Sequence, residues 1–350
     1  MYFDPEPKTR IEDFFNMEEE LKSFTESLNK EKLIVVTGLR RYGKTSLILT
    51  GLNISGSEYL FLDCRLLPSG IISIRDFLIL LEDELNRRSW TRRILHGVEE
   101  VSIGDFGLRI RRMERNTFLK LVERLKGKIL VLDEAQELRR SNYNFNGLIA
   151  YIYDHLDLKV IVSGSKIGLL YNFLKVNDPE APLFGRPYME VKLGKLSPQK
   201  AKEFLVRGFE QEKVKISDDI IEEAVRKFDG VIGWLTYFGH SYARSRETIS
   251  MIVEKASKLS ANEVNHALNI YGIGRERYVS ILKIVASSEG LRWSEIKRAF
   301  EAKHGRIPNN TLSNIIKNLV NQGLLEKIDD YYEVTDPILK IGISRYLSYK

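Results

Sequence analysis

Residues 38–45 read Gly38-Leu39-Arg40-Arg41-Tyr42-Gly43-Lys44-Thr45, which matches the phosphate-binding loop pattern G-x-x-x-x-G-K-[ST]. The apolar segment 32–37 before it predicts a buried strand, and the segment 45–49 after it predicts a helix. Glycines let backbone N–H groups approach a polyphosphate, and the helix N-terminus adds partial positive charge at the same place. The order of strand, loop and helix therefore favours a P-loop in an α/β domain over a chance match on a glycine turn.

The residue types in this loop have separate chemical tasks. We expect Lys44 to reach the β- and γ-phosphates and the Thr45 hydroxyl to ligate Mg²⁺. Arg40 and Arg41 lie inside the loop and either contact phosphate, contact a partner or are solvated. The expected nucleotide contacts are Gly38, Arg40, Arg41, Tyr42, Gly43, Lys44, Thr45, Ser46 and Asp133.

A second motif, Lys-Ile-Leu-Val-Leu-Asp-Glu, occupies residues 128–134. Its four consecutive aliphatic residues predict a central parallel strand, and its polar end lies where open α/β sheets bind ligands. We expect Asp133 to hold Mg²⁺ and Glu134 to act as general base on water, which favours hydrolysis over transfer to a metabolite. The alternative is that both residues only cap a helix starting near Ala135.

The composition sets wide limits on function. The chain has 350 residues, a formal net charge of +6 and one cysteine, Cys64. The length predicts two or three domains, and a single cysteine excludes an internal disulfide or a cysteine-rich zinc site. No apolar run approaches the roughly 20 residues needed to cross a bilayer, so we expect no membrane partner and a cytoplasmic location. The modest basic excess permits a polyanionic partner but does not require one.

The segments up to residue 195 alternate between strand and helix patterns. This alternation predicts a parallel sheet with right-handed crossovers. A looser alternation over 98–110, broken at Gly104-Asp105, predicts a β-hairpin. The further strands are expected at 58–63, 158–165 and 189–193, and helices at 10–31, 72–88 and 117–125.

The character of the chain changes after residue 196. Ser197 is a predicted N-cap with Pro198 at the first helical position. Residues 197–270 predict helices only, with breaks near 213–214 and 229–230, and we interpret them as a helical lid. The predicted domains are therefore a P-loop ATPase domain at 1–195, the lid at 196–272 and a third domain at 273–350.

Residues 273–350 have the layout of a winged helix. Three helices, near 276–287, 293–303 and 309–322, precede a short hairpin at 324–335. Polar residues at the start of the third helix suit phosphates and base edges, whereas the partly acidic wing at 326–330 would repel a phosphate backbone. DNA contact and protein contact therefore both stay open. The polar residues of the third helix are Asn309, Asn310, Thr311, Ser313, Asn314 and Lys317.

Taken together, these motifs resemble the archaeal ATPase family, which belongs to the STAND class of P-loop NTPases and is related to AAA+ and replication-initiator ATPases. The resemblance covers nearly the full chain. It implies a sheet with the P-loop strand beside the sensor strand, a helical lid, a winged helix, and binding of ATP or ADP with Mg²⁺. Family members usually carry an arginine where this chain has Met17 and a proline where it has Ile232. Besides the P-loop, the matching segments are 132–136, 163–165, 183–186, 233–235 and 335–337.

Four residues have two readings each. Ser163 and Ser165 either sense the γ-phosphate or cap a strand end. Gln136 either positions water or is a surface helix residue. Arg186 either stabilises charge during hydrolysis, in the same chain or across an oligomer, or forms a surface salt bridge.

Two functions from different classes follow. The leading hypothesis is an ATP-binding and ATP-hydrolysing molecular switch, in which nucleotide state controls the lid and the winged helix. The alternative is a nucleotide-gated DNA-binding regulator or replication-initiator-like protein. Either one could form a nucleotide-dependent oligomer and could use the winged helix to bind DNA or a protein.

Overall fold

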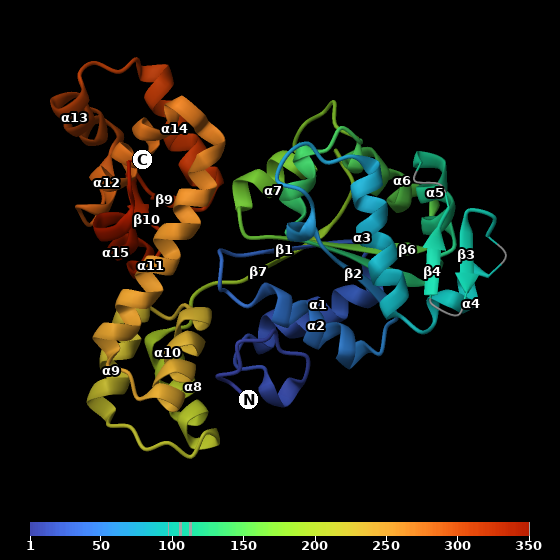
Figure 1. Cartoon of the computed structure of the whole chain (residues 1–350), viewed down its shortest axis with the longest axis horizontal. Helices are drawn as coiled ribbons and strands as arrows, with labels where there is room; N and C mark the ends of the chain where they lie inside the picture. The colour runs from blue at the N-terminus through green and yellow to red at the C-terminus, as the bar shows by residue number, and fades with distance from the viewer. Residues whose placement is uncertain (97, 105–106, 112–113, 350) are drawn as a thin grey trace. The chain divides into compact units, whose positions relative to one another are not determined.

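The computed structural model describes residues 1–96, 98–104, 107–111 and 114–349, which Figure 1 traces from the N-terminus to the C-terminus. The chain forms two compact units. We call residues 8–39 and 44–193 the sheet unit, and residues 1–7, 40–43 and 194–350 the helical unit. The chain passes from one unit to the other inside the P-loop, so Arg40–Gly43 belongs to the helical unit. The predicted boundaries of three domains stay a prediction.

Five parallel strands form the main sheet of the sheet unit, in the order β2-β5-β6-β1-β7. This topology confirms the predicted α/β P-loop fold, and it puts the P-loop strand β1 directly beside β6, which carries Ser163. All five strands point their carboxyl ends to one edge, because parallel strands share a direction. The strands are β1 Leu33–Thr37, β2 Tyr59–Asp63, β5 Lys128–Asp133, β6 Leu158–Gly164 and β7 Met189–Lys192.

Strand side chains alternate between the two faces of this sheet, and both faces are buried. In register, Leu60, Leu130, Val160 and Leu33 form a row across four strands on one face. Three aromatic rings, from Phe77, Phe118 and Phe145, pack together within the same core. Each fully buried aliphatic or aromatic side chain contributes about 1.5–3 kcal/mol, so this core contributes strongly to the stability of the sheet.

Helices cover both faces of the sheet. Figure 1 shows α1 and α2 on one face and α6 and α7 on the other. The edge strand β2 is protected, because the buried carboxylate of Glu84 accepts a hydrogen bond from the Phe61 N–H at 3.1 Å. The helices are α1 Glu18–Lys30, α2 Lys44–Ser55, α3 Ile74–Arg87, α4 Thr91–Leu95, α5 Arg115–Glu123, α6 Phe145–His155 and α7 Ile167–Leu174, with short 3-10 turns at Ile11–Asp13 (η1), Cys64–Leu66 (η2) and Ala135–Arg140 (η3).

The start of α1 and the hairpin of the sheet unit compare differently with the predictions. The single helix predicted over residues 10–31 is wrong at its start, because Asn16 and Met17 adopt left-handed backbone angles (φ 55° and 66°) and α1 begins only at Glu18. The predicted hairpin is present as β3 (Val101–Gly104) and β4 (Gly107–Ile110), which pair antiparallel. Residues 105 and 106 of its turn lie outside the described residues.

The first part of the helical unit is a group of helices closed by the N-terminal segment. Phe3 is 1% exposed and lies against two glycines, Gly208 of α8 and Gly239 of α10. A Cβ at either position would overlap the Phe3 ring, so the two glycines create the space for it. Ser197 caps α8 and Pro198 follows at its first turn, as predicted. The helices are α8 Pro198–Gln211, α9 Asp218–Phe228, α10 Ile232–Ser245 and α11 Ile249–Leu268, followed by the 3-10 turn η4 Asn269–Gly274.

The last part of the helical unit is the predicted winged helix. Its three strands pair in the order β8-β10-β9, and the β9–β10 turn places Asp329 in a left-handed conformation (φ 52°). Buried side chains from all three helices, among them Ile281, Ile296 and Leu312, share one core. The elements are α12 Arg275–Ala286, β8 Leu291–Arg292, α13 Trp293–His304, α14 Asn309–Asn321, β9 Leu325–Ile328, β10 Tyr331–Val334 and α15 Pro337–Tyr346. Across the described ranges, no helix is long and apolar enough to cross a membrane.

Candidate functional site

The P-loop has the backbone that its sequence predicts. Gly38 and Gly43 adopt positive φ angles of 152° and 84°, which only glycine adopts readily. Lys44 opens α2 with its side chain 5% exposed, and its ammonium donates to the carbonyl oxygens of Gly38 at 2.8 Å and Leu39 at 3.0 Å. The Lys44 side chain is thus folded back over its own loop, and its ammonium group lies where it can form an ion pair with a bound anion.

Asp133 ends the central strand β5 with its side chain 1% exposed. Its Oδ2 accepts a hydrogen bond from the Thr45 hydroxyl at 3.0 Å, and its Oδ1 accepts one from the Ser163 hydroxyl. Burial raises the pKa of Asp133, and the two hydroxyls partly oppose that shift.

The Thr45–Asp133 pair suits Mg²⁺. This ion prefers oxygen ligands and is usually held by one or two protein groups together with phosphate oxygens. Within the described part of the chain, no group of three or more His, Cys, Asp or Glu side chains could hold a metal by itself. An ion at this place would combine Thr45 and Asp133 with further oxygens, from water or from phosphate.

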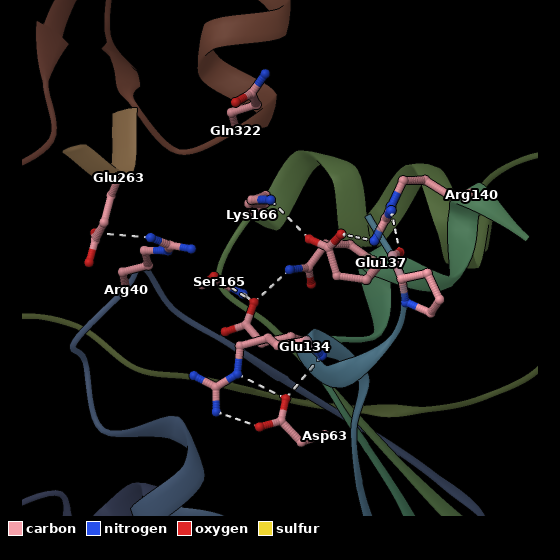
Figure 2. Close-up of polar contacts among 12 residues, drawn as sticks. Arg40, Asp63, Glu134, Glu137, Arg140, Ser165, Lys166, Glu263 and Gln322 are labelled. Atoms are coloured by element: carbon pink, nitrogen blue, oxygen red, sulfur yellow. Dashed lines mark hydrogen bonds and ion pairs between the residues drawn. The ribbon is translucent and has the colours of Figure 1, made fainter. Parts of the chain in front are cut away.

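Glu134 follows at the strand end and is held by three hydrogen bonds to one oxygen, Oε2. Ser165 donates its N–H at 3.1 Å and its hydroxyl at 2.6 Å (Figure 2). The side-chain amide of Gln136 donates an N–H at 2.5 Å. The other oxygen, Oε1, lies 3.9 Å from the Lys44 ammonium. Burial alone raises the pKa of Glu134, but Lys44 and the bonds from Ser165 and Gln136 together lower it.

The structure thus brings Lys44, Thr45, Asp133 and Glu134 together at the carboxyl edge of the sheet, as the two motifs predict. Glu134 occupies the N-cap position of the following 3-10 turn, but its side chain makes no capping hydrogen bond, so the alternative that it only caps this turn is wrong. With a lowered pKa, its carboxylate is ionised at neutral pH and can accept a proton. The arrangement can hold a triphosphate and activate a water molecule beside it.

Gln136, Ser163 and Ser165 each had two interpretations from the sequence, and the structure bears on them. Gln136 is 1% exposed, so its interpretation as a surface residue is wrong. Ser163 and Ser165 bind the carboxylates of Asp133 and Glu134, respectively, which neither sequence reading anticipated. These contacts form because β5 and β6 are adjacent in the sheet. The order of the strands is not specified by the local sequence.

Arg186 does not join this group. It precedes β7 and therefore lies toward the amino edge of the sheet, opposite to Lys44 and Glu134. Its guanidinium forms a two-point ion pair with Asp154 of α6, at 2.9 and 2.6 Å. A catalytic role for Arg186 within its own chain is therefore contradicted, and the salt-bridge reading is confirmed; a role across an oligomer stays a prediction.

The tip of the P-loop has a partner that the sequence did not reveal. Glu263 of α11 accepts from the Arg41 guanidinium at 3.0 and 2.6 Å and lies 2.9 Å from Arg40 (Figure 2 shows the Arg40 pair). The Arg41 guanidinium also stacks 3.8 Å above the Trp234 ring, and its carbonyl accepts from the Gly233 N–H at 2.9 Å. A Cβ at Gly233 would lie 2.5 Å from the Arg41 Cβ, so glycine permits this close approach. These residues all belong to the helical unit.

The two remaining predicted contacts have structural partners. Tyr42 is 6% exposed in the helical unit, where burial and nearby acids such as Asp336 raise its pKa. The Ser46 hydroxyl accepts from the Lys8 N–H at 3.0 Å and so ties the N-terminal segment of the sheet unit to α2. Neither contact by itself points to a nucleotide.

Comparison with known proteins agrees with this geometry. Residues 14–238 match a family described as an ATPase domain predominantly from Archaea, and residues 273–334 match the C-terminal winged helix-turn-helix domain of MCM proteins. The Walker-type ATPase PABY2304 of Pyrococcus abyssi is 32% identical, with a TM-score of 0.81 over 98% of this chain and 99% of that one. Cdc6p from Pyrobaculum aerophilum is 14% identical, with a TM-score of 0.50 over 98% and 96% of the two chains, and shares the fold only. No curated protein sequence matches the chain.

Proposed function

The chain belongs to the family of ATPase domains found predominantly in Archaea, and from that premise we propose that it is a molecular switch that binds ATP with Mg²⁺ and hydrolyses it slowly. Lys44 holds the β- and γ-phosphates, Thr45 and Asp133 hold Mg²⁺, and Glu134 is the general base. The observation that carries this proposal is the 3.9 Å between Lys44 Nζ and Glu134 Oε1, because a phosphate-binding cation and a base then serve one substrate.

The proposed chemistry uses groups that are already arranged. Glu134 takes a proton from water as the terminal phosphoryl group is transferred, and its lowered pKa keeps the carboxylate in the ionised form that this step requires. Lys44 exchanges the carbonyl oxygens of Gly38 and Leu39 for phosphate oxygens, which bear full charge. Bound Mg²⁺ supplies charge neutralisation for the phosphate oxygens.

The P-loop tip supports the switch. Phosphate and the Glu263 carboxylate are both anions that pair with guanidinium groups, so they compete for Arg40 and Arg41. ATP binding then draws these arginines from Glu263 and breaks the ion pairs between the P-loop tip and α11, the helix that precedes the winged helix. Hydrolysis and release of phosphate restore the Glu263 pairs.

A hydrolysis assay tests the enzymatic half. Purified protein with Mg²⁺ and ATP should release phosphate, and Glu134→Gln should slow release by about a hundredfold to ten-thousandfold while ATP stays bound. Glu137→Gln is the matched control, because Glu137 is held between Lys166 and Arg140 next to the same edge (Figure 2). Equal rates for Glu134→Gln and wild type would exclude Glu134 as the base.

A second candidate, nucleotide-gated DNA binding, is favoured by the surface around α14. Lys303, Arg306 and Lys317 are exposed there, close in sequence to the exposed Asn309 and Asn310. Such a surface suits phosphates and base edges. The match to an MCM winged helix is consistent with a DNA or protein partner.

Anisotropy of a labelled duplex, titrated with salt with and without ATP, tests this second candidate. Lys317→Ala should weaken binding and lower the slope of log K against log salt by about 1, whereas Lys327→Ala on the wing should change neither. Absence of binding at low salt would leave a protein as the partner of the winged helix.

Self-association is a separate proposal. Arg186 could act only on the nucleotide of a second copy, since its own site lies at the opposite edge of the sheet. Light scattering of Glu134→Gln with ATP should then show an oligomer that Arg186→Ala weakens. A monomer under both conditions would exclude this role.

A further inference from the structure

The two oxygens of the Glu134 carboxylate have different surroundings. Oε2 accepts three hydrogen bonds, two from Ser165 and one from Gln136. Oε1 faces Lys44 at 3.9 Å and accepts no hydrogen bond from any residue that the structure describes. One oxygen is therefore fixed, and the other is available to water.

The orientation of the Gln136 amide leaves one of its polar atoms without a hydrogen bond. An ionised carboxylate only accepts hydrogen bonds, so the amide nitrogen of Gln136 must face Glu134. Its amide oxygen is then buried, and it has no partner among the residues described. A buried acceptor without a partner destabilises the fold, and a methionine of similar volume would avoid this penalty. The glutamine is thus a poor choice for stability alone.

Gly164 makes room for this amide. A Cβ at residue 164 would collide with the Gln136 amide oxygen and would lie 3.1 Å from Leu170 Cδ2. The glycine ends β6 one residue before Ser165, so one short segment both orients a donor to Glu134 and accommodates the second donor. Two separate parts of the chain therefore converge on Oε2.

We propose that Ser165 and Gln136 are positioning residues that fix Glu134 through Oε2 and so direct Oε1 at the attacking water. The inference rests on the proposed hydrolysis by Glu134 and assigns the orientation of that base. Ser165 is then a holder of the base, and the γ-phosphate is not its direct contact.

Steady-state hydrolysis and ATP binding of Ser165→Ala and Gln136→Met test the proposal in the full chain. Each variant should lose about tenfold in kcat, since each removes a hydrogen bond to a charged group, with the dissociation constant of ATP unchanged. Ser165→Thr keeps the hydroxyl and should recover most of kcat. Gln136→Met should melt no lower than wild type, because it removes the unpartnered oxygen. Glu137→Gln again serves as the control with wild-type kcat.

The double variants separate positioning from general damage. In a Glu134→Gln background, neither Ser165→Ala nor Gln136→Met should slow hydrolysis further, because both act through Glu134. Losses that multiply with that of Glu134→Gln, weaker ATP binding, or unchanged kcat in both single variants would overturn the inference alone. A wild-type protein without hydrolysis would overturn the proposed function and this inference together.

Discussion

The two ends of the P-loop differ in what holds them. Lys44 belongs to the sheet unit, is 5% exposed, and lies over the carbonyls of its own loop and beside Glu134. Arg40 and Arg41 belong to the helical unit and are bound by Glu263, more than 220 residues along the chain. One end is held by the local backbone and by Glu134 at the end of β5, and the other end is held by ion pairs with Glu263. The loop therefore combines a buried lysine with two more exposed arginines, and the proposed switch depends on that difference.

The largest expected effect contrasts two cations of the loop. Lys44→Ala should weaken ATP binding by on the order of a hundredfold, because it removes a buried charge that bonds to phosphate. Arg40→Ala should change the affinity by less than about threefold, since its half-exposed side chain is shared with Glu263. Titration calorimetry measures both constants. Similar losses in the two variants would remove the distinction between the ends of the loop.

Removing the Glu263 carboxylate, which competes with phosphate for the arginines, should strengthen ATP binding and not weaken it. Glu263→Gln frees Arg40 and Arg41 for phosphate and should tighten ATP binding by about tenfold. The control is Glu254→Gln, on the same helix, where the carboxylate is exposed and forms its ion pair with Lys258, away from the P-loop arginines. Weaker ATP binding by Glu263→Gln would contradict competition between this carboxylate and the nucleotide.

The Glu263 contact should also give the protein a defined pH dependence. Burial raises the pKa of Glu263, but the hydrogen bonds and charges of Arg41 and Arg40 outweigh it, so the folded-state value is lowered. A lowered carboxyl pKa stabilises the fold above the ordinary value of about 4.3, and this contribution is lost as the pH falls through the lowered value.

Urea unfolding of wild type and Glu263→Gln measures this contribution. The difference in unfolding free energy should be about 1 kcal/mol near neutral pH and should shrink below about pH 4. A difference that grows on acidification would have the wrong sign for an ionised Glu263.

The smallest expected effect is a difference in stability between lysine substitutions of Arg41 and of Arg40. Arg41→Lys keeps the charge but loses the two-point bond to Glu263 and the flat stacking on Trp234, and should cost about 0.5–1 kcal/mol of stability. Arg40→Lys keeps its single exposed pair and should cost less than about 0.5 kcal/mol. Equal losses in chemical denaturation would show that the stacking geometry of Arg41 contributes nothing.

The sequence predicts the sheet end of the site well for a physical reason. Lys44, Thr45, Asp133 and Glu134 follow strands, and parallel strands bring their carboxyl ends to one edge. The winged helix was also predictable, because its apolar periodicity and its short hairpin are local signals.

The positions of Glu263, Arg186 and Gln136 could not be predicted, because they depend on contacts between segments that are far apart in the sequence. Nothing in the amphipathic pattern of α11 distinguishes Glu263 from Glu254, the other acid of the helix. Arg186 precedes β7, which starts at the edge of the sheet opposite to the site. Placing Arg186 there requires knowing that β7 runs parallel to β1. Gln136 is polar and follows a strand, so its burial over Gly164 could not be inferred from its position in the chain.

Fluorescence of Trp234 tests most directly whether nucleotide at the sheet edge releases the P-loop arginines. In a chain with Trp90→Phe and Trp293→Phe, the remaining indole reports on the Arg41 guanidinium 3.8 Å away. We expect Mg²⁺ and ATP to change the emission, which should return to its starting value as ATP is consumed and stay changed in Glu134→Gln. Emission that stays constant while ATP is bound to saturation would contradict the switch.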